Sequence, residues 1–144
     1  MRFLVRYKFS LCVVAAIVYL CFFTPPETSL GEITNFDKFV HFSMYFLFTA
    51  VIWHEYLLSH RGGFTISWLS PKDEERRPMS RLRLVVGALL APIAFSGLIE
   101  LGQKYLTTTR SGEWWDFAAN STGALLTFIT FSIIIAVKKH RKNG

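Results

Sequence analysis

Residues 100–123 of the chain read Glu-Leu-Gly-Gln-Lys-Tyr-Leu-Thr-Thr-Thr-Arg-Ser-Gly-Glu-Trp-Trp-Asp-Phe-Ala-Ala-Asn-Ser-Thr-Gly. This polar stretch joins two strongly apolar segments. It contains five side chains of the kinds that bind ligands or transfer protons: Glu100, Gln103, Arg110, Asp116 and Asn120. Polar side chains are costly to place within a membrane, so those found there indicate a functional site by default.

The composition indicates a membrane protein. Hydrophobic residues make up 51% of the 144 residues and fall into four segments. Each segment is close to the roughly 17–25 residues that a bilayer-spanning helix needs. We therefore predict an all-α integral membrane protein, a single four-helix domain over residues 1–144, with transmembrane helices at about 6–23, 37–58, 84–103 and 115–137.

Prolines and a capping pattern mark where these helices begin, bend and end. Pro25 and Pro26 end the first helix, because proline lacks an N–H donor and disfavours helix in the residue before it. Thr34 and Asp37 have the spacing of a capping box at the start of the second. Pro92 should kink the third. The first segment resembles a signal peptide, but no small-x-small cleavage site follows it, so we expect it to remain as a span.

Basic residues predict the orientation. Of the 16 lysines and arginines, three lie at the N-terminal end, six in the loop 59–83 and four at the C-terminal end. The positive-inside rule then places both termini and the loop 59–83 in the cytoplasm, for a multi-pass protein of the cytoplasmic (inner) membrane. Nucleic-acid binding is not expected despite the net charge of +6, because the basic residues flank apolar segments and no soluble domain presents them.

Four crossings with this orientation bring polar side chains from three helices to the outer face. They come from the start of the second helix, the end of the third, the following link and the start of the fourth. The candidate ligand-binding residues are Asp37, Lys38, Tyr45, Gln103, Arg110 and Asn120, and the candidate catalytic residues are Glu100, Asp116 and His41. Spacings of three and four residues place the members from each helix on one face.

These residue types suit an anionic ligand. Lys38 and Arg110 would hold the anion, Arg110 through its planar fork. Glu100 or Asp116 would act as acid or base, and His41 as a proton shuttle. A structural interpretation stays open, since interhelical hydrogen bonds between the same residues would hold a membrane bundle together.

No cofactor or metal site is assigned from the sequence. Carboxylates near the anion site are chemically able to ligate metals. However, the one zinc-like pattern, His54-Glu55, lacks a second histidine at the fourth position after His54; the next is His60.

The ordered set of polar residues resembles the pattern of VanZ-like membrane proteins, a family named for a teicoplanin-resistance protein. The similar residues are Asp37-Lys38-x-x-His41-Phe42-x-x-Tyr45, Glu100-x-x-Gln103, Arg110 and Asp116-x-x-x-Asn120-x-x-Gly123. The resemblance covers about residues 37–137. It implies a small helical protein of the bacterial cytoplasmic membrane that acts at the cell envelope, with a link to glycopeptide resistance. The long basic loop 59–83 departs from the family pattern.

Two hypotheses of function follow. In the first, the outer-face residues bind the polar head of an envelope molecule, such as a lipid-linked precursor or an anionic lipid, and act on it. In the second, the chain is a non-enzymatic accessory or scaffold subunit in the lipid bilayer. Its outer residues then only lock the fold, while the loop 59–83 recruits a protein partner or anionic headgroups.

The orientation predicts which positions react with reagents outside the cell. In a chain without Cys12 and Cys21, a membrane-impermeant thiol reagent should label Ser111→Cys in intact cells. It should label Arg77→Cys and Lys139→Cys only after the cells are opened, because the basic segments stay inside. Labelling of the two basic positions in intact cells, with Ser111→Cys protected, would show the opposite orientation.

Overall fold

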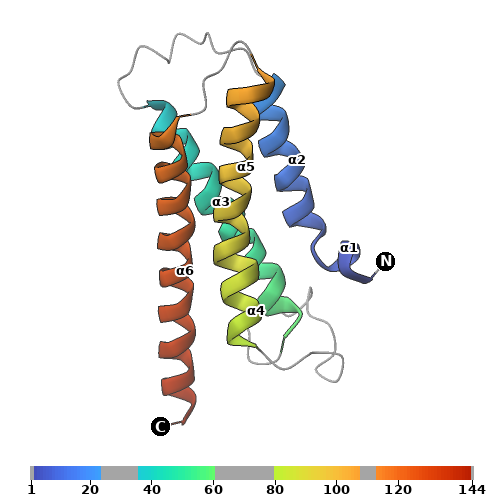
Figure 1. Cartoon of the computed structure of the whole chain (residues 1–144). Helices are drawn as coiled ribbons and strands as arrows, with labels where there is room; N and C mark the ends of the chain where they lie inside the picture. The colour runs from blue at the N-terminus through green and yellow to red at the C-terminus, as the bar shows by residue number, and fades with distance from the viewer. Residues whose placement is uncertain (1, 24–35, 61–79, 108–112, 144) are drawn as a thin grey trace.

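The computed structural model describes residues 2–23, 36–60, 80–107 and 113–143. These residues form helices and no strand, which confirms the all-α prediction (Figure 1). The helices are α1 (Arg2–Arg6), α2 (Lys8–Phe23), α3 (Phe36–Leu58), α4 (Arg81–Val85), the π-helix η3 (Val86–Leu90), α5 (Ala91–Leu106) and α6 (Trp114–Asn143). The predicted cap at Thr34 and most of the loop 59–83 lie outside the described residues.

Two segments are long and apolar enough to cross a membrane. They are Arg81–Leu106, which comprises α4, η3 and α5, and Trp114–Lys138 of α6. α2 is also apolar, but has only 16 residues, and α3 is longer and more polar. The four predicted spans are therefore supported for the third and fourth, and the first two remain predictions.

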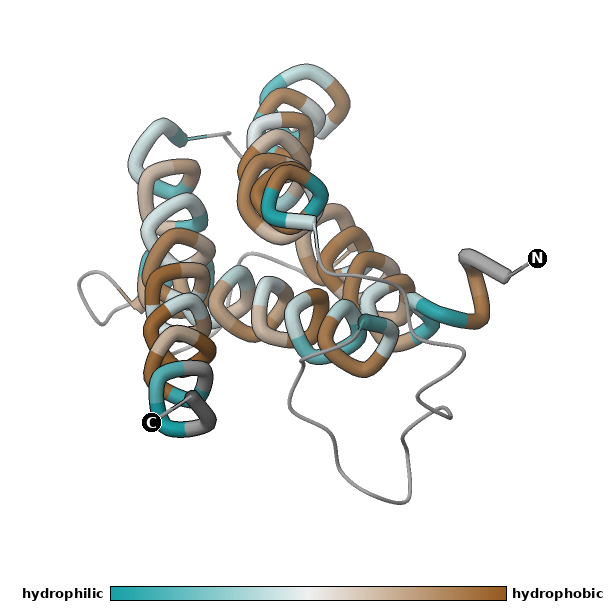
Figure 2. Tube along the Cα trace, turned by 90° about the horizontal axis from the view of Figure 1, so that it is seen from below, coloured by the Kyte–Doolittle hydropathy of each residue, from teal (hydrophilic) through white to brown (hydrophobic). Residues whose placement is uncertain are grey.

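Large apolar side chains cover much of the outer surface of the helices. On α6 they include Leu125, Leu126, Ile129, Ile133 and Ile134. Only 22% of the most apolar window of Trp114–Lys138 is buried inside the structure. Figure 2 shows hydrophobic residues along the helices and hydrophilic ones towards several helix ends. Exposed apolar surface of this extent is rare in soluble monomers and marks a surface that meets a membrane or a partner.

The first helix is broken where a continuous one was predicted. Tyr7 separates α1 from α2. The buried carboxylate of Glu55, on α3, accepts hydrogen bonds from the backbone N–H groups of Phe9 (2.8 Å) and Ser10 (3.0 Å) and from the Ser10 hydroxyl. Because the first N–H groups of a helix have no partner within it, Glu55 caps α2 from a neighbouring helix.

Pro92 produces a π-helical turn. The backbone N–H of Ala91 donates to the carbonyl of Val86, five residues earlier, and η3 covers residues 86–90. Proline has no N–H and its ring displaces the preceding carbonyl, so the helix widens by one residue before it. The predicted irregularity is thus present, and it takes the form of a π turn immediately before Pro92.

The closest packing in the bundle is that of α3 on α6, which lie side by side (Figure 1). At Gly123 the two backbones are so near that an added Cβ would meet the carbonyl oxygen of Phe42 and lie 3.0 Å from the nitrogen of Phe46. Four residues later, Thr127 donates to the carbonyl of Phe46 at 3.1 Å. A small residue at this position lets helices approach at backbone distance.

Gly123→Ala should therefore destabilise the bundle. The new methyl group would meet backbone atoms, which cannot move aside as a side chain can, at a cost of about 1–3 kcal/mol. Gly87→Ala is the matched control, because nothing lies within 4 Å of its Cβ position. Thermal unfolding of the purified proteins in detergent should show a clear loss for Gly123→Ala alone; equal stability of the two variants would contradict the close approach.

Candidate functional site

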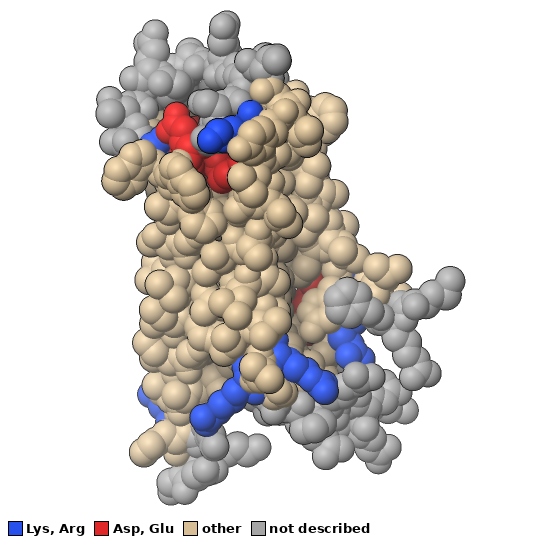
Figure 3. Space-filling view, in the orientation of Figure 1, with Lys and Arg blue, Asp and Glu red and all other residues tan. Residues whose placement is uncertain are grey.

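Charged and polar side chains of α3, α5 and α6 gather at one end of the bundle. This end, called the polar end below, lies at the top of Figure 3, where acidic and basic groups occur together; the opposite end shows mainly lysine and arginine. Its described members are Asp37, Lys38, His41, Glu100, Glu113, Asp116 and Asn120. The predicted convergence of three helices is present.

Lys38 joins α3 to the start of α6. Its ammonium lies 3.1 Å from Glu113 Oε2 and 3.2 Å from Asp116 Oδ1. The sequence predicted Lys38 as a holder of an external anion, but in the structure its charge is shared between two carboxylates of the protein. Glu113 was not among the predicted site residues; its position just before the tryptophans at the start of α6 was the available signal.

A buried chain of hydrogen bonds runs from α5 through α6 to α3. Asn120, which is fully buried, donates from Nδ2 to Glu100 Oε1 at 3.3 Å. Its Oδ1 lies 3.2 Å from Nδ1 of His41. The other oxygen of Glu100 accepts from the backbone N–H of Glu113 at 3.2 Å. Because an amide oxygen can only accept, this chain places a proton on Nδ1 of His41.

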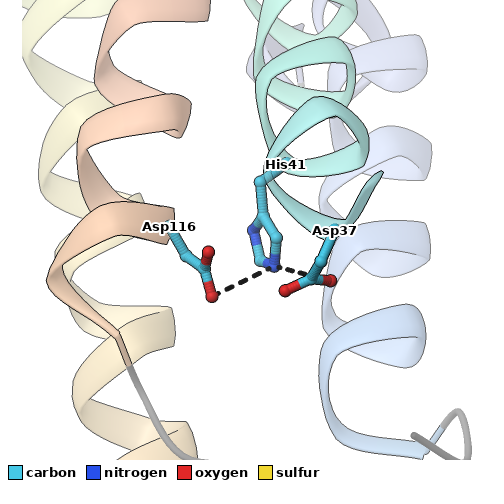
Figure 4. A group of neighbouring side chains, drawn as sticks. All are labelled: Asp37, His41 and Asp116. Atoms are coloured by element: carbon cyan, nitrogen blue, oxygen red, sulfur yellow. Dashed lines mark ion pairs between the residues drawn. The ribbon is translucent and has the colours of Figure 1, made fainter. Parts of the chain in front are cut away.

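The second ring nitrogen of His41 faces two carboxylates. Nε2 lies 3.8 Å from Asp37 Oδ1, one helical turn earlier on α3, and 3.8 Å from Asp116 Oδ2 on α6. Figure 4 shows the imidazole between the two carboxylates. Neither distance is that of a hydrogen bond. The side chains of His41 and Asp116 are 4% and 7% exposed, whereas that of Asp37 is 63% exposed, so the group opens to the outside through Asp37.

Two of the nine predicted residues lie outside this network, and a third is not among the described residues. Gln103 is buried and donates to the carbonyl of Cys21 at 3.1 Å, which ties the end of α2 to α5. Tyr45 is fully buried in an apolar cluster with Phe48 and Ile99. Arg110 lies outside the described residues. The remaining six predicted residues are brought together.

The described part of the polar end is acidic. Four carboxylates, those of Asp37, Glu100, Glu113 and Asp116, face one lysine and His41. Like charges so close raise each other's energy unless a positive charge lies among them. Within this network, which does not include Lys104 near the same end, carboxylates outnumber the lysine and favour a further cation.

A cavity lies in another part of the bundle. A cavity of about 590 Å³ is lined mainly by apolar side chains of α2, α3, η3 and neighbouring residues, with Arg6 and Arg83 among its polar members. No carboxylate is among the described residues that line it. It has no combination of acids and bases like that of the polar end, so the polar end is the candidate functional site.

Comparisons of the chain with protein-family models, with curated proteins and with solved structures found no match. The resemblance to VanZ-like proteins therefore remains a prediction that rests on the sequence pattern.

Asn120 should be important for stability as well as for the site. Asn120→Ala would leave buried groups of Glu100 and His41 without their partner, at a cost of about 1–3 kcal/mol. The neighbouring Ser121→Ala is the control, because the buried Ser121 hydroxyl has no hydrogen bond within the described residues. Thermal unfolding in detergent should separate the two variants, and an unchanged midpoint for Asn120→Ala would show that the chain of hydrogen bonds contributes little.

Proposed function

We propose that the protein is a four-span protein of the bacterial inner membrane whose polar end faces outward and binds the polar head of an envelope molecule, either a lipid-linked precursor or an anionic lipid. The gathering of buried, interconnected acids, amides and an imidazole at one end of the bundle is the observation that supports it. Such groups are costly in a membrane protein and mark functional sites.

The length of α3 is compatible with the proposed second span. α3 has 23 residues, about 34 Å of helix, and the hydrocarbon core is about 30 Å thick. Its charged residues Asp37 and Lys38 lie in the first turn, and Glu55 is satisfied by three donors near the other end. Charges placed and paired in this way do not oppose insertion as strongly as charges at the centre of a span.

Two tryptophans fit the proposed membrane boundary. Trp114 and Trp115, at the start of α6, are 83% and 74% exposed. Indole rings prefer the interface between headgroups and hydrocarbon. The polar end would then lie at headgroup level, where a lipid headgroup reaches it without leaving the membrane.

Within the site the residues have distinct roles. Glu100 and Asn120 set the orientation of His41, so that its Nε2 faces Asp37 and Asp116. Lys38 holds Asp116 in place. Arg110, as the sequence predicts, supplies a second cation for an anionic headgroup. The resemblance to VanZ-like proteins supports an envelope role and a link to glycopeptide resistance.

The alternative is an accessory subunit that acts through its basic cytoplasmic loop. It is favoured by one observation: Arg81 and Arg83 are exposed, and they belong to α4, which lies at the end of the bundle opposite the polar end (Figure 1). Basic residues beside a cytoplasmic leaflet attract anionic lipids and acidic partners.

Lipids that copurify with the protein distinguish these two functions. Mass spectrometry of wild-type protein should detect an enriched polar lipid that is lost from Glu100→Gln, because the change turns one of the two accepting oxygens of Glu100 into a donor. Lys104→Gln, near the same end but outside the network, should keep that lipid. Neutralising Arg81 and Arg83 should leave it bound as well.

Loss of the lipid from the Arg81 and Arg83 variant, with retention in Glu100→Gln, would favour the accessory function. Absence of any enriched polar lipid in the wild type would overturn the proposed function.

A further inference from the structure

We infer that Asp37, His41 and Asp116 form a binding site for a divalent transition-metal ion, with Zn²⁺ the best-fitting probe, and that this ion is the anchor for the anionic part of the headgroup. The metal site stands on the geometry described above. Its role as the anchor rests on the proposed function.

The ligand atoms converge. One oxygen from each carboxylate and a ring nitrogen of His41 all lie within 4.8 Å of one another. Asp37 and His41 are four residues apart on α3, a spacing that places two ligands on one helix face, as in helical zinc sites. Asp116 comes from the facing helix α6 (Figure 4). The set combines imidazole nitrogen with carboxylate oxygen, which are common zinc ligands.

The orientation of His41 is the independent observation. The amide oxygen of Asn120 accepts from Nδ1, so Nε2 is the ring nitrogen that faces the two carboxylates. Two carboxylate oxygens and Nε2 therefore share one space without hydrogen bonds between them. A metal ion in contact with all three would offset the repulsion between the carboxylates.

The surroundings of these ligands match those of known metal sites. A ligating histidine usually donates its other N–H to an oxygen acceptor, here Asn120, and a ligating carboxylate is usually hydrogen-bonded as well. Asp116 presents Oδ1 to Lys38 at 3.2 Å and Oδ2 to His41. Lys38 and Asn120 are therefore positioning residues, and Glu100 orients Asn120 in turn.

The distances are compatible with zinc after a small movement. With Zn–N and Zn–O bonds of about 2.0–2.2 Å, ligand atoms in a tetrahedron lie about 3.3 Å apart. The two contacts of Nε2 are 3.8 Å, so each must shorten by about half an ångström, and the two carboxylate oxygens, which lie within 4.8 Å of each other, must also move closer. Asp37, which is exposed and in the first turn of α3, is free to close this gap.

Three protein ligands leave one position of a tetrahedral ion open. On this site the open position faces the exposed side, near Asp37. A phosphate or carboxylate oxygen of a headgroup bound there would be held by the charge of the metal ion. The same charge would offset the excess of carboxylates at the polar end. The ligand chemistry implied is therefore an anion that a divalent cation bridges to the protein.

Metal titration of the full-length protein tests the site. Protein in detergent is treated with a chelator, freed of it by dialysis, and titrated with Zn²⁺ by calorimetry, with bound metal counted by mass spectrometry. We expect one ion per chain. Asp116→Asn should weaken binding by more than the factor of about 10–100 typical of losing an outer-shell partner.

Two further variants keep this test decisive if Asp116→Asn does not fold. Asp37→Asn changes an exposed side chain, so it should fold normally and still bind Zn²⁺ more weakly. His54→Asn, which removes a histidine of α3 outside the polar end, should bind Zn²⁺ as the wild type does. Co²⁺ in place of Zn²⁺ should give the visible absorption of a tetrahedral site in the wild type and lose it in Asp37→Asn.

Absence of Zn²⁺ binding to the wild type, or equal weakening by His54→Asn, would overturn the metal site. In that case the three residues are an ion pair of a protonated imidazole with two carboxylates. The anchoring role is tested separately: chelation should release the copurifying polar lipid, and a lipid retained after chelation would overturn that role. A protein that binds Zn²⁺ without any enriched lipid would confirm the metal site and overturn the headgroup function.

Discussion

The close packing of α3 on α6 is the constraint on which the rest of the structure depends. Gly123 allows the two backbones to approach so closely that a methyl group does not fit between them. Above this contact, Asn120 reaches His41 and Asp116 reaches Lys38; below it, Thr127 donates to the carbonyl of Phe46. Side chains as short as asparagine and aspartate bridge the helices only at such a separation. A larger residue at position 123 would therefore push α3 and α6 apart and disturb the polar end as well.

In a bundle with so much exposed apolar surface, each buried polar group needs a hydrogen-bond partner from the protein itself. A buried polar group without a partner costs more free energy than a hydrogen bond contributes. Glu55 illustrates the solution, because three donors from the start of α2 satisfy its two oxygens. Gln103 likewise meets a carbonyl at the end of α2. Both ends of α2 are thus fixed to the bundle by polar side chains of its neighbours.

Much of this arrangement was predictable from the sequence. Apolar segments predicted the helices and their approximate bounds, and the spacing of Asp116, Asn120 and Gly123 predicted one face of α6 directed at its neighbours. Six of the nine predicted site residues lie in the polar end. Their partners were not predictable, because a contact between helices depends on rotation and depth, which periodicity does not specify. Glu113 and Glu55 were missed for this reason.

The same limit explains the breaks within the helices and the position of Tyr45. A helix that is capped by a side chain of another helix needs no capping residue in its own sequence. The start of α2 at Lys8 was therefore not predictable from the sequence. Pro92 predicted an irregularity but not its π form, because several distortions accommodate a missing N–H. Tyr45 shares the four-residue spacing of Asp37 and His41, yet one further turn places it in the apolar cluster.

The polar groups around Glu55 and those around His41 differ in a way that bears on function. Around Glu55 the donors match the acceptors, and the protein completes its own hydrogen bonding. Around His41 they do not match, since the carboxylates of Asp37 and Asp116 both face Nε2 at 3.8 Å without a hydrogen bond to it. Stability of the fold alone favours the arrangement around Glu55, because a fully hydrogen-bonded group needs no external ligand. An excess of acceptor atoms, held in place by Asn120 and Lys38 and exposed at Asp37, is stabilised when a cation binds. This difference between the two groups distinguishes a binding site from a structural contact.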